Sequence, residues 1–382
     1  MTTPTLEERG LPPAAPARPL PPFTADHERF RAELRDYVES ELRPRAPEYE
    51  RERWFPSELF TELGDRGLLG LKYPRELGGA GGDHLDDAVL CEELARCGSG
   101  GLAAAIGAHT GIATPPIWRF GTPDQHERFL VPAIRGEKIA ALGITEPGAG
   151  SDVAGIRTTA QRVDGGWRVN GSKTFITNGV RAGFVVTAVK TTREGGHHGL
   201  SFLIIERGSE GFSVSRKLEK LGWHASDTAE LAFSDVFVPD ENLLGEVNRG
   251  FKLIMANFQW ERLIMALGAV ASMKAVLERI VASEPGARWR QAVAEMAVKH
   301  EASRALTYHA LRVFTTDGNA VREVTEAKLL SQRSAFEVAE TAFRILDRDL
   351  EIGRAMRDTR LGPIGGGTDE VMKEILAKQL GL

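Results

Sequence analysis

The sequence predicts an α+β protein in which a central antiparallel β domain lies between an N-terminal helical domain and a C-terminal helical bundle. Hydrophobic residues recur with a helical period at both ends of the chain and with a period of two in the middle. The 382 residues also exceed what one simple core accommodates. The predicted parts are a disordered Pro-rich tail (1–23), an N-terminal helical domain (24–136), a β domain (137–241) and a C-terminal helical domain (242–382).

The composition is that of a soluble globular protein, with 42% hydrophobic and 26% charged residues. A formal net charge of −5 gives no reason to expect nucleic acid binding. No apolar run reaches the length of a membrane span. Glu7 and Glu8 argue against an organellar transit peptide, so we expect a cytoplasmic protein. Cys91 and Cys97 fit no metal-binding spacing, so we expect free thiols and no metal site.

The N-terminal domain is expected to begin with a helix after Thr24 or Asp26, either of which can cap it. A second helix is expected to end at Gly64 or Gly67, since glycine favours helix termination. Small residues in the run 101–113 permit close helix packing or room for a ligand. The apolar face of the first helix is formed by Phe30, Leu34, Tyr37, Val38 and Leu42.

The β domain is indicated by alternation around Asp164-Gly165-Gly166, which predicts a hairpin. Further strands are expected in 183–192, 198–206, 212–221 and 229–238. The C-terminal domain opens with a long helix over 250–280 that is apolar on more than one face, which places it centrally in a bundle. Three more helices are expected in 289–314, 321–346 and 368–381.

The densest glycine motif is ALGITEPGAGSDVAG, residues 141–155. Its free backbone and the Ser151 hydroxyl can hold an anion, although an ordinary glycine-rich turn explains the composition equally simply. The string ITEPGAGSDVAG, with KTFITNG (173–179), LGWHASDTAELAFSDVFVP (221–239) and IGGGTDEVMKEI (364–375), resembles the acyl-CoA dehydrogenase family. The resemblance extends from about residue 24 to residue 382, and the α–β–α order agrees with it.

This resemblance implies that FAD binds against the β domain and that an acyl-CoA lies between the flavin and the helices. It implies removal of two hydrogens from the α and β carbons of the thioester, in fatty acid metabolism. It further implies a tetramer that passes electrons to an electron-transfer flavoprotein. The implied FAD contacts are Leu142, Ile144, Thr145, Gly150, Ser151, Phe175, Thr177, Thr368 and Glu370, and the implied substrate contacts are Ser151, Gln259, Arg262, Gly366 and Gly367.

The reaction needs a base for the α-proton. In much of the family this base is a Glu two residues before the Thr of the C-terminal motif, but that position here is Gly366. The branch that handles long or branched chains carries its Glu on the long helix, just before an Arg, as Glu261 and Arg262 stand here. Apolar neighbours raise the pKa of a carboxyl group toward the range that a base needs. We therefore expect Glu261 to be the catalytic base; a surface Glu–Arg pair is the alternative.

Other polar residues are expected to be structural. Glu146 and Asp152 are interpreted as turn and hydrogen-bond formers in the cofactor loop. His197 and His198 lack a further ligand for a metal, so a solvated loop is favoured. His224 is expected to have a structural role.

Two family elements that hold the neighbouring subunit's FAD are altered. No R-x-x-F-G string follows the long helix, although Arg288 or Arg290 can substitute. A Gln and a glycine turn are replaced by Arg344, Asp347, Arg348 and Leu350. These changes favour a hetero-oligomer, with a homotetramer as the alternative. Competing hypotheses are a flavin oxidase or a dehydrogenase of a specialised acyl substrate, and a non-catalytic structural subunit.

Overall fold

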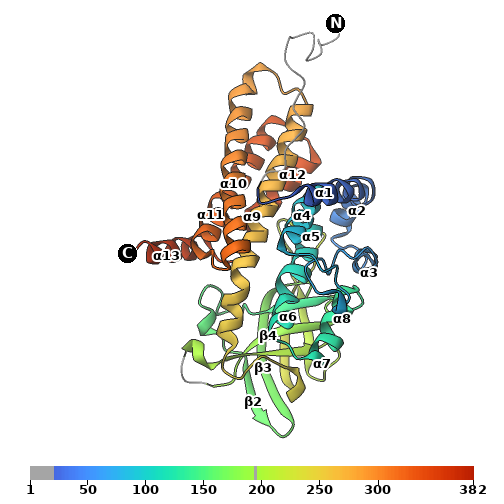
Figure 1. The fold of residues 1–382 in the computed structure, drawn as a ribbon, viewed down its shortest axis with the longest axis vertical. Helices are drawn as coiled ribbons and strands as arrows, with labels where there is room; N and C mark the ends of the chain where they lie inside the picture. The colour runs from blue at the N-terminus through green and yellow to red at the C-terminus, as the bar shows by residue number, and fades with distance from the viewer. Residues whose placement is uncertain (1–20, 193–195) are drawn as a thin grey trace.

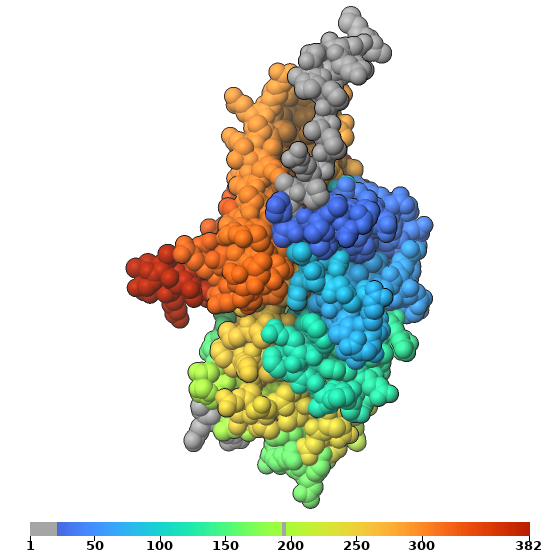
Figure 2. Space-filling view, viewed as in Figure 1, coloured from blue at the N-terminus to red at the C-terminus, as the bar shows by residue number. Residues whose placement is uncertain are grey.

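The computed structural model describes residues 21–192 and 196–382, so most of the predicted disordered tail lies outside the described residues. The two helical parts and the β domain are arranged as expected (Figure 1). The helical bundle forms one end of an elongated molecule and the β domain the other, with the N-terminal helices along one side. Helix α13 projects from the bundle, which is also visible in the space-filling view (Figure 2).

The N-terminal domain consists of short helices, several of which are joined by π-helical turns. The predicted apolar face of the first helix is confirmed, because Leu34, Tyr37, Val38 and Leu42 are buried. The elements are α1 (Ala25–Tyr37), η1 (Val38–Leu42), α2 (Arg43–Glu52), α3 (Glu58–Asp65), α4 (His84–Leu94), α5 (Gly100–Gly107), η4 (Ala108–Ala113), α6 (Pro115–Phe120), α7 (Pro123–Gln125) and α8 (Val131–Ile134).

The β domain is one sheet in the order β6-β7-β3-β2-β4-β5-β8, with β1 beside β4. The predicted hairpin is present, since β2 and β3 pair antiparallel with Val163 opposite Gly166. The sheet is mixed, because β4 pairs parallel with β1 and β2. The alternation of residues predicts strands but carries no information on their relative direction. The strands are β1 (Ala140–Gly143), β2 (Thr159–Val163), β3 (Gly166–Thr177), β4 (Phe184–Lys190), β5 (Leu200–Glu206), β6 (Phe212–Lys217), β7 (Thr228–Pro239) and β8 (Leu243–Leu244).

The C-terminal domain is organised around α9 (Gly250–Ala282), which runs from the β domain into the bundle (Figure 1). Its residues enter three hydrophobic clusters: one with the N-terminal helices, one with the β domain and one within the bundle. This explains why its sequence is apolar on more than one face. The remaining helices are α10 (Arg290–Asp317), α11 (Val321–Ile345), α12 (Leu350–Asp358) and α13 (Asp369–Gln379).

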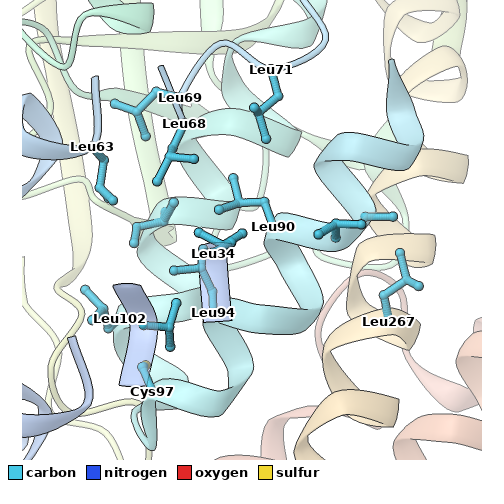
Figure 3. Close-up of a cluster of buried hydrophobic side chains, with 14 of the residues drawn as sticks. Leu34, Leu63, Leu68, Leu69, Leu71, Leu90, Leu94, Cys97, Leu102 and Leu267 are labelled. Atoms are coloured by element: carbon cyan, nitrogen blue, oxygen red, sulfur yellow. The ribbon is translucent and has the colours of Figure 1, made fainter. Parts of the chain in front are cut away.

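The cluster that joins the N-terminal helices to α9 is rich in leucine. Leu90 and Leu94 of α4 lie between the N-terminal segments and Leu267 of α9 (Figure 3). Both predicted free cysteines lie in this region and are confirmed as free. The cluster fixes the position of α9 relative to the first domain.

A buried ion pair of the β domain lies at its boundary with the N-terminal domain. Arg181 lies over the rings of Trp54 and Phe55, donates to the Phe55 carbonyl at 2.9 Å and pairs with Asp227 at 2.6 Å. Asp227 also accepts from the backbone N–H of Val180 at 2.7 Å. Because both charged side chains are almost fully buried, each depends on the other for compensation of its charge.

We expect Arg181→Met to lower the melting temperature by roughly 5 to 10 °C, since removing one member of a buried pair costs about 3–5 kcal/mol. Thermal unfolding followed by circular dichroism measures this. The matched control is Arg216→Met, which removes an arginine whose ion pair with Glu230 is exposed. Equal melting temperatures for the two variants would contradict the assignment.

Candidate active site

Glu261 lies on α9 opposite the glycine loop that precedes α13. One carboxylate oxygen of Glu261 lies 3.9 Å from the position that a Cβ on Gly366 would occupy. The side chain is half-buried and has no hydrogen bond or ion pair with the residues that the structure describes. Burial raises the pKa of Glu261 to about 7, although the charges of Arg262 and Lys328 act in the opposite direction. A carboxyl group in this state can accept a proton near neutral pH.

Gly366 and Gly367 have backbone conformations that favour glycine. Gly366 has a φ of +62°, and a Cβ added to it would lie 2.4 Å from Sδ of Met265. Gly367 has a φ of +98°, and a Cβ there would lie 2.5 Å from Cε of Met372. The positive φ favours glycine at both positions, so the loop approaches α9 there through its backbone.

Two cationic side chains hold the carbonyl groups of this loop. Nε of Arg262 donates to the Gly366 carbonyl at 3.3 Å, and Nζ of Lys328 on α11 donates to the Gly367 carbonyl at 2.6 Å. Within the described residues, the N–H groups of Gly366 and Gly367 have no hydrogen-bond partner. The loop thus turns its carbonyls toward the helices and keeps two donors free. Lys328 was not singled out from the sequence. The feature that could have identified it is a lysine next to Ala327, in a helix face of otherwise small residues.

A second loop, residues 144–152, is fixed to the β sheet by a buried ion pair. Nζ of Lys173 donates to the Glu146 carboxylate at 2.8 Å and to the Ile144 carbonyl at 3.0 Å. Glu146 also accepts from the N–H groups of Arg157 and Thr158 at 2.5 and 2.9 Å. Burial favours the neutral acid, but the charge of Lys173 and these donors keep the pKa of Glu146 below its ordinary value. Glu146 is therefore a structural residue, as predicted.

The exposed part of this loop has glycines that its own packing does not require. A Cβ at Gly148 would meet nothing within 4 Å, and one at Gly150 would meet only Cγ2 of Thr145, at 3.9 Å. Ser151 beside them is also exposed. The bare backbone here leaves room for another molecule to approach the N–H groups.

Phe175 is an exposed aromatic residue in a strained conformation. Its φ is +60°, its side chain is 68% exposed, and the pairing of β3 with β7 is irregular between Lys173 and Ile176. A bulky residue with positive φ is uncommon, and such strain is concentrated at functional sites. Thr177, two residues later, is half-buried at the end of β3 opposite Thr228.

The sequence-predicted residues fall into two groups. Glu261, Arg262, Gly366 and Gly367 form one contact group around the glycine loop. The second group lies on the β domain, where Leu142 and Ile144 pack with Phe258 of α9 in one hydrophobic cluster. The Thr174 N–H donates to the Thr145 carbonyl at 2.9 Å. This bond places the loop with Thr145, Gly150 and Ser151 near Phe175 and Thr177.

Three predicted residues have structural partners. The Gln259 side-chain oxygen accepts from the Ala320 N–H at 2.7 Å, which directs it toward the start of α11. Thr368 caps α13 by accepting from the Val371 N–H at 3.4 Å. Glu370 is exposed in the first turn of this helix, where its charge is favourable.

The histidines with no predicted chemistry have ordinary surroundings. His197 lies against His198 and Phe251, with ring centroids 4.0 and 4.9 Å apart. His224 bonds the Lys220 carbonyl at 2.9 Å. Among the described residues, one group could geometrically hold a metal ion, namely His27, Asp83 and Asp86. It was not expected from the sequence; the two aspartates are the N-cap and third residue of α4, which explains their proximity.

The segment after α11, one of the two that differ from the family elements named above, forms a hydrogen-bonded helix start. After α11, Asp349 caps α12 by accepting from the N–H groups of Glu351 and Ile352, and Arg279 of α9 binds its carboxylate at 2.8 Å. Leu350 is 84% exposed at this helix start. A capped helix therefore begins where the sequence resemblance leads one to expect a glycine turn.

None of the helices in the described ranges is long and apolar enough to cross a membrane.

Comparison with known proteins gives matches along most of the chain. The family models for the N-terminal, middle and C-terminal domains of acyl-CoA dehydrogenases match residues 24–137, 141–236 and 248–381. A mitochondrial isovaleryl-CoA dehydrogenase of Solanum tuberosum is 33% identical, over 94% of this chain and 91% of the relative.

Solved structures of similar fold include members of the same family. An acyl-CoA dehydrogenase from Geobacillus kaustophilus is 35% identical, with a TM-score of 0.92 over 95% of this chain and 100% of that one. More distant matches are PigA in complex with FAD (25% identical, TM-score 0.90, 94% of this chain and 98% of that one) and the prolyl acyl carrier protein oxidase AnaB (26% identical, TM-score 0.88, 94% and 100%). The chain belongs to the acyl-CoA dehydrogenase family of flavoprotein oxidoreductases, enzymes that act on CH–CH bonds.

Proposed function

We propose that this protein dehydrogenates an acyl-CoA thioester between its α and β carbons, with Glu261 as the base that removes the α-proton. The observation that carries the proposal is the position of Glu261: half-buried, without a partner among the described residues, and in contact with the glycine loop. The same observation supports membership of the branch that carries its base on the long helix. A surface Glu–Arg pair would instead be exposed and mutually bonded.

FAD is the cofactor that the site fits. The open backbone at Gly148 and Gly150 suits the negatively charged pyrophosphate, and the exposed ring of Phe175 suits a flavin face. Thr177 at the end of β3 is assigned the hydrogen bond near flavin N5. When bound, the flavin supplies the acceptor for the hydride that leaves the β carbon.

The chain's own residues carry the proton chemistry. The Glu261 carboxylate accepts the α-proton and becomes a carboxylic acid, which the surrounding apolar residues favour. The free N–H of Gly366 is assigned to the thioester oxygen, where enolate charge develops. Arg262 stays bonded to the carbonyl of the same residue and fixes the loop backbone next to this donor. Ser151 and Gly367 are assigned to the thioester side of the same site.

The proposed acceptor of the electrons is an electron-transfer flavoprotein, in keeping with the family. The proposed location is the cytoplasm. A specific alternative is an oxidase of a carrier-protein-bound acyl group, which the likeness to the carrier-protein oxidase AnaB favours. Oxygen consumption with peroxide release, in the absence of an electron acceptor, distinguishes this alternative.

For assembly we propose a hetero-tetramer, with a homotetramer and a purely structural subunit as the alternatives. The segments that follow α9 and α11 differ in sequence from the elements to which the family resemblance assigns the neighbouring FAD. Leu350 and the Asp349 cap stand at one of these positions. A related chain would supply these elements to the flavin held by this chain.

Glu261→Gln should lower kcat by a factor of about 10² to 10⁴ or more, because the amide cannot accept the proton. A panel of acyl-CoA thioesters of different length and branching, assayed with a dye acceptor, first identifies the best substrate. The control is Glu295→Gln on α10, where the glutamate is exposed. Activity of Glu261→Gln close to that of the wild type would refute the proposed base and favour a structural subunit.

The same substitution should also change stability in a pH-dependent manner. The folded protein holds the pKa of Glu261 at about 7, above its ordinary value of 4.5, so ionisation above pH 7 destabilises the native state. Glu261→Gln should therefore raise the free energy of unfolding by about 1–3 kcal/mol at pH 8. The gain should shrink between pH 7 and pH 4.5 and vanish below. Denaturant unfolding of the flavin-free protein measures it; a gain independent of pH would contradict the raised pKa.

Purified alone, the chain should bind FAD weakly and below one flavin per subunit. Each lost charge-assisted contact costs roughly 1.5–3 kcal/mol, so two losses weaken binding by about two to four orders of magnitude. Flavin absorbance per subunit measures occupancy, first for the lone chain and then for the chain coexpressed with a homologous candidate partner. Full and tight occupancy in the lone chain would refute the hetero-oligomer.

A further inference from the structure

Lys328 is a buried charged residue beside the proposed base for which the reaction described above has no use. Its side chain is fully buried on α11, yet its ammonium group donates to a single acceptor, the Gly367 carbonyl, at 2.6 Å. A lysine is rarely buried so completely unless it is paired. No carboxylate of the described residues forms an ion pair with it within 4 Å, so the loop carbonyl is its direct partner.

Two other polar residues of α11 also contact the segment around the glycine loop. One turn further along, Gln332 donates to the Met265 carbonyl of α9 at 2.6 Å and lies against Gly362. Arg333 binds Asp369, the first residue of α13, at 2.6 Å. Lys328 thus lies at the end of a row of polar residues by which α11 holds both ends of the loop.

The carbonyls of Gly366 and Gly367 are held from two different helices. Arg262 of α9 binds the first, and Lys328 of α11 binds the second. In a peptide group the N–H points opposite to the C=O of the preceding residue, so directing these two carbonyls toward the helices directs the N–H groups of Gly367 and Thr368 away from them. Loss of Lys328 would release the loop where it borders Glu261.

The charges around Lys328 come from three helices. Glu261 and Arg262 face it from α9, and Asp369 and Glu370 face it from α13, with Arg333 of its own helix bound to Asp369. Burial lowers the pKa of Lys328 to about 8, while the three carboxylates oppose this. The ammonium charge in turn lowers the pKa of Glu261 against the effect of burial.

We propose that Lys328 is a positioning residue for the dehydrogenation: it fixes the backbone at Gly366 and Gly367, and its charge stabilises the Glu261 carboxylate that takes the proton. This inference rests on the proposed function of Glu261. Lys328 touches neither substrate nor flavin and acts through the loop and through the base.

The test compares four variants over a range of pH with the best substrate of the acyl-CoA panel. Lys328→Met removes the donor and the charge, Lys328→Gln retains a donor without the charge, and Lys328→Arg retains both. Lys299→Met is the matched control, because this lysine is exposed on α10 and pairs with Glu337. Circular dichroism confirms the fold of each variant.

Both neutral variants should shift the acid limb of the pH–kcat profile upward, because the Glu261 carboxylate then loses the favourable charge of Lys328. Lys328→Met should also lower kcat by about 10²-fold through displacement of the loop, with KM changed much less. Lys328→Arg and Lys299→Met should keep the wild-type acid limb. An unshifted acid limb in both neutral variants would overturn the proposal.

Two further measurements do not depend on the neutral variants being active. The carboxylic acid band of Glu261, obtained by infrared difference against Glu261→Gln in the flavin-free protein, should persist to higher pH in Lys328→Gln. The wild type should lose activity above pH 8, and Lys328→Arg should abolish this alkaline limb because arginine stays protonated. An unchanged band, or an alkaline limb retained in Lys328→Arg, would count against it.

The two proposals fail separately. If Glu261→Gln retains activity, the proposed base is wrong whatever Lys328 does. If Glu261→Gln is inactive while the Lys328 variants keep the wild-type pH profile, only the role of Lys328 is wrong.

Discussion

The proposed chemistry depends on the partial burial of one carboxylate. Glu261 lies on a helix whose neighbouring positions Trp260 and Leu263 are buried, and the glycine loop closes over it. Because no donor among the described residues stabilises the charge directly, burial controls the proton affinity. The rest of the fold serves this arrangement. The three hydrophobic clusters around α9 hold the helix, and α11 holds the loop.

The two halves of the site are built on different physical principles. On the β domain, the Lys173–Glu146 pair is buried and mutually satisfied, so the loop that carries Gly150 and Ser151 is fixed while its outer backbone stays open. In the bundle, the charges of Arg262 and Lys328 form no ion pair with Glu261. They influence its pKa through space and bind the backbone carbonyls of the glycine loop. The first arrangement favours binding of an anion, and the second favours a carboxylate that changes its protonation state.

The fold could be predicted from the sequence because its signals are local, and the candidate site residues followed from the resemblance of short motifs. Helical and strand periodicity located the three domains, and the Asp164-Gly165-Gly166 turn located the hairpin. Glu261 was identified because it precedes Arg262 in a motif. Lys328, the parallel pairing of β4 and the bond of Gln259 to Ala320 are contacts between segments far apart in the sequence, and no local pattern encodes them.

The packing of Met265 against Gly366 has a consequence for the position of the acid. A carboxylate placed on the loop at position 366 would need a strained backbone, because φ is positive there, and would have to displace Sδ of Met265. A smaller residue at 265 would in turn leave a void beside the proposed base. The packing around Gly366 therefore favours an acid on the helix over an acid on the loop.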